Sequence, residues 1–165
     1  MSFIATEPGH TPHPADSSVA PERRATIVND GWFPDIDLSA LRDAMRLDGT
    51  VTHERLVDAV TGAIADVNAQ LGTWQATQLS AGFGSLGDVP SPVIDGQSVR
   101  LTRYRSAVYR LAKADLTARY RDYDSTKSGA ARAEELETTI DDDRRAAHWA
   151  ISDITGRRRT TVELI

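Results

Sequence analysis

The feature that most constrains the fold is a helical repeat of apolar residues over three long stretches of the chain. Between 52 and about 80 the apolar positions recur mostly at spacings of three and four: Leu56, Val60, Ala63, Ile64, Val67 and Leu71. The same period marks 97–123, with Leu101, Tyr104, Val108, Leu111, Leu116 and Tyr120, and 131–154, with Ala133, Leu136, Ile140, Ala147, Ile151 and Ile154. Apolar stripes of this kind face a shared core, so the sequence predicts an all-α fold.

Capping residues indicate where these helices begin and end. Asp37 is placed to cap a fourth, shorter helix that runs through Leu47 and is ended by Asp48-Gly49. Thr52 is placed to cap the next helix, and Gly156 suits the left-handed position after the last one. We therefore expect a small helical bundle of one short and three long helices.

The two ends of the chain differ in composition from the helical part. Four of the seven prolines lie in residues 1–30, which we expect to form a flexible or extended N-terminal arm. Residues 31–156 form the predicted helical domain, with order beginning at Gly31-Trp32-Phe33-Pro34. Residues 157–165 form a basic and then β-prone tail. An isolated strand at Thr160–Ile165 must pair, fray or be covered, and strand addition to another chain and fraying are both open.

Composition excludes several classes of protein. A chain of 165 residues with 40% hydrophobic residues suits one domain with a real core. A net charge of −5 argues against a protein that coats nucleic acid. The absence of cysteine excludes disulfides, thiolate zinc sites and thiol catalysis. Without a long apolar run or a signal-like N-terminus, we expect a soluble intracellular protein that does not enter membranes.

Motifs that would carry catalysis or bind a ligand are incomplete. The glycines of 82–87 fit a dinucleotide pattern but follow a helix instead of a strand. Asp122–Thr126 starts like a calcium loop whose sixth and twelfth positions hold Lys127 and Ala133. The four histidines are scattered and no serine lies in a nucleophile elbow. We therefore predict no enzyme activity, no cofactor and no metal.

Charge divides between the last two helices. Helix 97–123 is locally basic, whereas 131–154 is acidic before Arg144 and Arg145. Two interpretations are open: ion pairs between these helices, or opposite charges on different sides that favour head-to-tail association. A small DNA-binding regulator that uses the basic helix is the alternative function.

The order of several short segments resembles one family. Phe33-Pro-Asp-Ile-Asp37, Met45-Arg-Leu47, Ala81-Gly-Phe83, Leu86–Pro90 and Ile94-Asp-Gly96 are followed by Leu116, Arg119-Tyr-Arg121, Thr139-Ile-Asp141, Trp149-Ala150 and the basic-to-apolar tail. This series is similar to the head completion protein (GPL) family of contractile-tailed temperate phages, from Phe33 to Ile165.

The resemblance implies a structural protein of the virion with the helical fold of phage head–tail adaptors. It implies a subunit in the neck that binds the portal vertex after DNA packaging, helps retain the genome and provides the surface for tail attachment, after assembly in the host cytoplasm. The implied partners are further copies in a ring, dodecameric on the portal, the portal protein, a tail completion or terminator protein, and packaged DNA. For the interface with partners we single out Trp32, Phe33, Arg157, Arg158, Arg159, Val162, Leu164 and Ile165.

Overall fold

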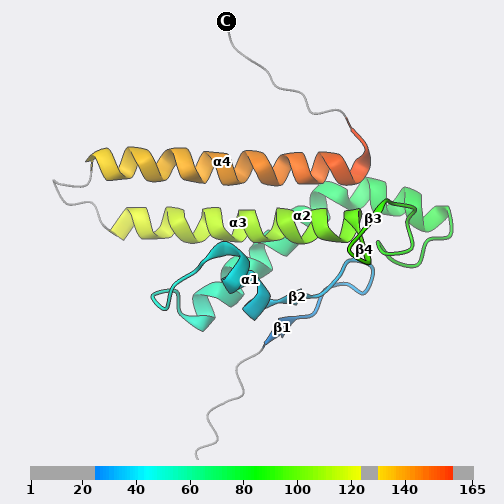
Figure 1. The fold of residues 1–165 in the computed structure, drawn as a ribbon, viewed down its shortest axis with the longest axis horizontal. Coiled ribbons are helices and arrows are strands. Elements are labelled where there is room, and N and C mark those ends of the chain that lie inside the picture. Colours follow the sequence, from blue (N-terminus) through cyan, green and yellow to red (C-terminus); the bar gives the residue numbers. More distant parts are fainter. Residues whose placement is uncertain (1–24, 124–129, 158–165) are drawn as a thin grey trace, which may run out of the picture.

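A long helical hairpin forms the frame of the molecule. The computed structural model describes residues 25–123 and 130–157, and the side chains of 25–119 and 136–157. Helix α3 (Val99–Tyr123) and helix α4 (Ala130–Thr155) run antiparallel along most of their length, as Figure 1 shows. Helix α2 (His53–Ser80) crosses α3 obliquely and touches α4 over a much smaller area. The predicted all-α bundle is therefore confirmed, with α3 packed against both of the other long helices.

The helix boundaries follow the predicted caps closely. The Thr52 side chain accepts a hydrogen bond from the Arg55 N–H at 3.4 Å, and both Val51 and Leu56 are buried. Gly156 has φ of +71° directly after α4, the left-handed conformation expected there. Helix α1 (Leu38–Met45) is capped by Asp37, as predicted. It ends two residues earlier than expected, because Arg46 takes the left-handed conformation at φ 53°.

Two short strand pairs add to the helices. Strand β1 (Thr26–Ile27) pairs antiparallel with β2 (Ile36–Asp37), and β3 (Val93–Ile94) pairs antiparallel with β4 (Gln97–Ser98). Each strand has two residues, too few for an alternating pattern to be visible in the sequence. The predicted architecture lacked both pairs.

The folded domain begins before Gly31, which corrects the predicted boundary of the N-terminal arm. Ile27 is buried, and the Leu38 N–H donates to the Ala25 carbonyl at 2.9 Å. Asn29 is held by the phenol of Tyr104, 2.8 Å from its side-chain amide. The predicted boundary came too late because contacts with residues distant in the sequence hold this segment, and composition does not reveal such contacts. Residues 1–24 of the predicted arm lie outside the described residues.

Aromatic residues close the core at the N-terminal end of α3. The Phe33 ring stacks on Tyr104 with centroids 4.8 Å apart, and Trp32 meets Phe33 edge to face at the same distance. Trp74 of α2 adds a second edge contact to Trp32 at 5.9 Å. Because edge and offset ring contacts are favourable, this cluster fastens the segment before α1 to α2 and α3.

Candidate functional site

Ion pairs join α3 and α4. The Asp143 carboxylate is buried and lies 3.0 Å from the Arg110 guanidinium and 3.4 Å from the Lys113 ammonium. Nearer the C-terminal end of α4, Arg103 contacts Asp153 at 3.3 Å. The first interpretation of the charge pattern, pairing between the two helices, is therefore confirmed for these residues. The same contacts weaken the alternative of a DNA-binding helix, because these cations already face carboxylates.

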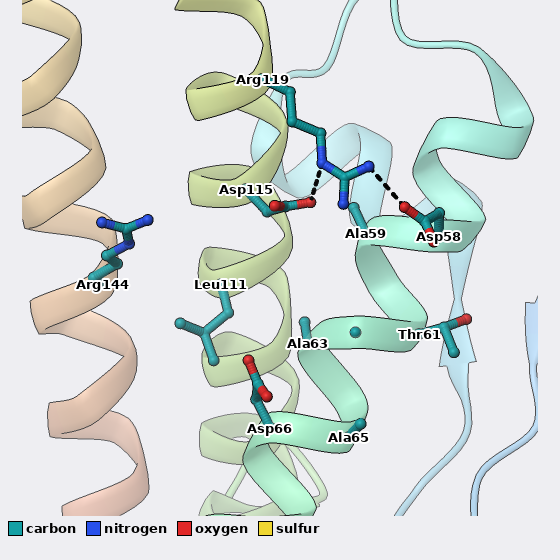
Figure 2. A pocket seen from close by; sticks show the side chains of 11 residues that line it. Asp58, Ala59, Thr61, Ala63, Ala65, Asp66, Leu111, Asp115, Arg119 and Arg144 are labelled. Atoms are coloured by element: carbon teal, nitrogen blue, oxygen red, sulfur yellow. Dashed lines mark hydrogen bonds and ion pairs between the residues drawn. The ribbon is translucent and has the colours of Figure 1, made fainter. Parts of the chain in front are cut away.

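A groove of about 470 Å³ lies between α2 and α3 (Figure 2). Arg119 spans it, with guanidinium nitrogens 2.7 Å from Asp58 and 3.0 Å from Asp115. Its hydrogen bonds to these carboxylates raise the pKa of Arg119. The α2 wall is formed largely by small residues, among them Ala59, Gly62, Ala63 and Ala65. A cation neutralised on both sides is poorly suited to bind an anionic ligand. We therefore interpret this groove as a result of helix packing and not as a binding site.

The β3–β4 hairpin is a rigid projection with exposed apolar side chains. Asp95 and Gly96 both have positive φ, 51° and 71°, as in the two-residue turns that match the twist of paired strands. The Val99 N–H donates to the Pro92 carbonyl at 2.9 Å, and this bond fastens the hairpin to the start of α3. Nevertheless Val93 and Ile94 remain 66% and 69% exposed. A fixed backbone with two uncovered apolar side chains is typical of a contact surface.

Further contacts hold the chain on both sides of the hairpin. The Arg100 guanidinium donates to the Pro90 carbonyl at 2.8 Å and lies over the Trp74 ring. Arg105 donates to the Gln97 side chain at 3.0 Å. A hollow of about 500 Å³ beside the hairpin is lined by Ile94, Asp95, Gln97, Val99, Thr102 and Arg103. We call the hairpin with this hollow the hairpin surface.

Trp32 and Phe33, predicted as interface residues, belong to the core of the subunit. They are 6% and 2% exposed, and the Trp32 indole N–H donates to the Phe83 carbonyl at 3.1 Å. The prediction that two adjacent aromatics must be covered is confirmed, but α2, α3 and the 81–90 loop cover them. This corrects their assignment to a partner interface, because little of either ring is left for a partner to touch.

The rest of the predicted interface lies at or beyond the end of α4. Arg157 is exposed directly after Gly156. Arg158, Arg159, Val162, Leu164 and Ile165 lie outside the described residues. The exposed Val93 and Ile94 were missed, although Asp95-Gly96 after two β-branched residues is a hairpin signal.

The two histidines in the described part of the chain differ in exposure. His53 is partly exposed and His148 is exposed, whereas His10 and His13 lie outside the described part of the chain. Within residues 25–119 and 136–157, no group of histidine or acidic side chains is arranged to hold a metal ion. No helix in the described ranges is long and apolar enough to span a membrane. Gly82, in the apparent dinucleotide motif, has φ of +94° in the turn that follows α2.

Together these features define a helical structural subunit whose charges support its own packing and whose hairpin offers a contact surface. Comparison with known proteins agrees with this class. The family model described as phage head completion protein (GPL) matches residues 27–165. The head completion/stabilization protein of Escherichia phage P2 is 39% identical over 139 residues, which cover 84% of this chain and 82% of that protein. No solved structure matches the chain significantly.

The chain belongs to the phage head completion protein (GPL) family. It is therefore a structural protein of a bacteriophage particle that acts in completing the head, and it is not an enzyme. The resemblance drawn from the ordered segments is confirmed.

Proposed function

We propose that this protein is a head-to-tail connector that binds the portal vertex once the head is filled with DNA. In that position it helps retain the genome and provides the surface on which the tail assembles. The observation that carries the proposal is the family match over residues 27–165, which spans nearly all of the folded domain and the tail. It therefore includes every surface described above.

The geometry supports a role in assembly. The α3–α4 frame is held by ion pairs and by a continuous core, so one face of the subunit can be presented in a fixed orientation. The hairpin surface is apolar, exposed and backed by that frame. Contacts of modest size become strong when they are repeated around an axis, because binding at one site places the neighbouring sites at high effective concentration.

We infer that several copies form a ring in the neck of the particle, between the portal protein and a tail completion or terminator protein. A ring of identical subunits needs two different complementary surfaces on each copy. The hairpin surface supports this as one of the two. Exposed Arg157, where the chain leaves α4, marks where the second would begin.

Deletion of the gene from the phage tests the proposal. We expect DNA-filled heads that leak their genome and carry no tails, with normal packaging up to that stage. Electron microscopy of the particles and nuclease digestion of the released DNA measure the two defects. Restoring the protein from a plasmid is the control. Intact, tailed and infectious particles from the deletion would refute the proposal, as would finding the protein in lysates but never in purified particles.

A further inference from the structure

Within residues 25–123 and 130–157, no segment covers the exposed apolar side chains of the hairpin surface. Among the described residues, β3 and β4 pair only with each other, so each strand keeps one open edge. Successive residues of a strand point to opposite faces, yet both Val93 and Ile94 are about two-thirds exposed. Neither of these β3 side chains is therefore packed against the rest of the subunit. An open edge next to exposed apolar side chains is a site to which an extended segment can add.

One segment of this chain has the chemistry that such a site takes. Residues 160–165 are β-prone, and the apolar Val162 and Leu164 stand two residues apart, on the same face of an extended strand. A short strand of this kind cannot satisfy its own backbone groups. Basic residues 157–159 precede it, whereas the acidic Glu163 lies within it.

Charges around the hairpin complement those of the tail. Asp95 is exposed at the tip of the hairpin, and Arg103 lines the hollow beside it. Arg105 lies next to Gln97 of β4. The basic start of the tail suits Asp95, and Glu163 suits Arg105, whose contact is with the neutral Gln97 side chain. Complementary charges of this kind fix the direction of an added strand more than they add affinity.

Arg157, where the tail begins, follows directly on the end of α4 that lies beside the hairpin surface. The pair between Arg103 and Asp153 joins the hollow to the last turn of α4, and β4 continues directly into α3. Figure 1 shows β3, β4 and the C-terminal end of α4 together at this end. Eight residues beyond Arg157 extend up to about 28 Å, enough to reach across to a neighbouring subunit.

We infer that the hairpin surface of one copy receives residues 160–165 of a second copy. Contacts among the described residues leave Val93 and Ile94 uncovered. Because the proposed ring needs a contact between copies, we take the donor to be another molecule. Because each copy carries one donor tail and one acceptor hairpin, the contact is head-to-tail and generates a ring when the rotation closes. The inference rests on the proposed function and supplies the contact that holds its ring together.

Engineered cysteines test this contact directly, because the natural chain has none. A phage carries the gene with Ile94→Cys and Leu164→Cys, and purified particles are oxidised and run on a non-reducing gel. We expect a ladder of covalent dimers and larger species that reducing agent removes. Val93→Cys with Leu164→Cys samples a second register if the first pair is misaligned. The matched control is Val28→Cys with Leu164→Cys, since Val28 is 77% exposed outside the hairpin.

Mixing single variants separates the possible donors. When Ile94→Cys and Leu164→Cys are produced as two separate chains in one cell, docking between copies gives mixed dimers and no longer ladder. An internal disulfide in the double variants would overturn the inference, because the tail would then cover its own hairpin. A cross-link only to another virion protein would overturn it equally.

The cross-linking experiment also separates a failure of the tail contact from a failure of the proposed connector role. A particle that contains the protein at its neck but shows no ladder in either register contradicts the tail contact and leaves the connector role intact. Absence of the protein from purified particles contradicts the connector role itself.

Discussion

At the scale of residues, three side chains hold the N-terminal segment on the helices. The Tyr104 hydroxyl donates to Asn68 at 2.6 Å and accepts from the Asn29 amide at 2.8 Å, and the Asn68 amide donates to Asn29 at 2.9 Å. Burial raises the pKa of Tyr104, so the hydroxyl stays a donor at all ordinary pH values. This closed set of hydrogen bonds joins the segment between β1 and β2 to α2 and α3 at one point.

We predict that Tyr104→Phe destabilises the protein by about 1–3 kcal/mol, because the two amides lose a shared partner in a partly buried place. Urea unfolding followed by circular dichroism measures the change. Tyr109→Phe is the control, since it removes the hydroxyl of another buried tyrosine outside this set. Equal losses in the two variants would show that the hydrogen bonds of Tyr104 contribute nothing specific.

The cap of α1 gives stability that depends on pH. Hydrogen bonds from the Ser39 hydroxyl and from the backbone N–H groups of Ala40 and Ser39 lower the pKa of Asp37 below its ordinary value of 3.8. A lowered pKa in the folded state means that the ionised cap stabilises the fold above that ordinary value. The contribution is lost as the pH falls through the lower pKa of the folded protein.

We therefore predict that the wild-type protein melts above Asp37→Asn at pH 7 and that the gap narrows as the pH falls below about 4. Calorimetry of the two proteins across this range measures the gap. Other carboxylates titrate alike in both proteins, so their effects cancel in the difference. A difference in melting temperature that stays constant down to about pH 2.5, well below the ordinary carboxyl pKa, would contradict a role for the ionised form.

At the scale of elements, the pairing of α3 with α4 determines the shape of the subunit. Ile140, Ala147, Ile151 and Ile154 of α4 are buried, which confirms these positions of the predicted stripe. Ala133 of that stripe lies outside the residues whose side chains are described. Asp143, three residues after Ile140, is buried with them and is paired across to α3. The helix thus contributes both apolar contacts and one paired charge to the same face.

Ile140→Asp should unfold the domain or cost at least about 3 kcal/mol, because it places a charge at an apolar position 3% exposed. Circular dichroism and thermal unfolding measure the loss. Thr139→Asp, at an exposed neighbouring position of the same helix, is the matched control and should leave the fold intact. A soluble, fully helical Ile140→Asp protein would show that the buried face of α4 is wrongly assigned.

The helices and strands also show which parts of the fold the apolar periodicity predicts and which it does not. The bounds of the three long helices agree with the predicted ranges within two residues, because each repeats its apolar positions over several turns. The end of α1 was missed, since a left-handed Arg46 has no distinctive signal in the sequence. The strands were missed because two residues cannot show alternation, and their pairing depends on what lies opposite.

At the scale of the whole molecule, the exposed apolar residues and the tail are the parts that we propose to act in assembly. Deletion of residues 158–165 should leave the melting temperature nearly unchanged while it sharply reduces incorporation into particles, because the tail is proposed to contact other molecules. Calorimetry of the purified protein and quantitative blotting of purified particles measure the two effects. Replacing Val162, Leu164 and Ile165 by serine keeps the length of the tail and should give the same loss of incorporation. If the melting temperature falls as far as incorporation, the tail is part of the core of its own subunit.

The sequence by itself determined the helices, their caps and the family, because periodic apolar positions, capping residues and an ordered series of segments are all local along the chain. It also indicated that Trp32 and Phe33 had to be covered. Only the tertiary structure decided what covers them, since burial depends on residues such as Tyr104 and Trp74 that are distant in sequence. Tertiary structure likewise decided that Arg103, Arg110 and Lys113 of α3 face carboxylates of α4, and that Val93 and Ile94 remain exposed. The tertiary structure therefore decides which side chains stay exposed, because it buries or pairs the others.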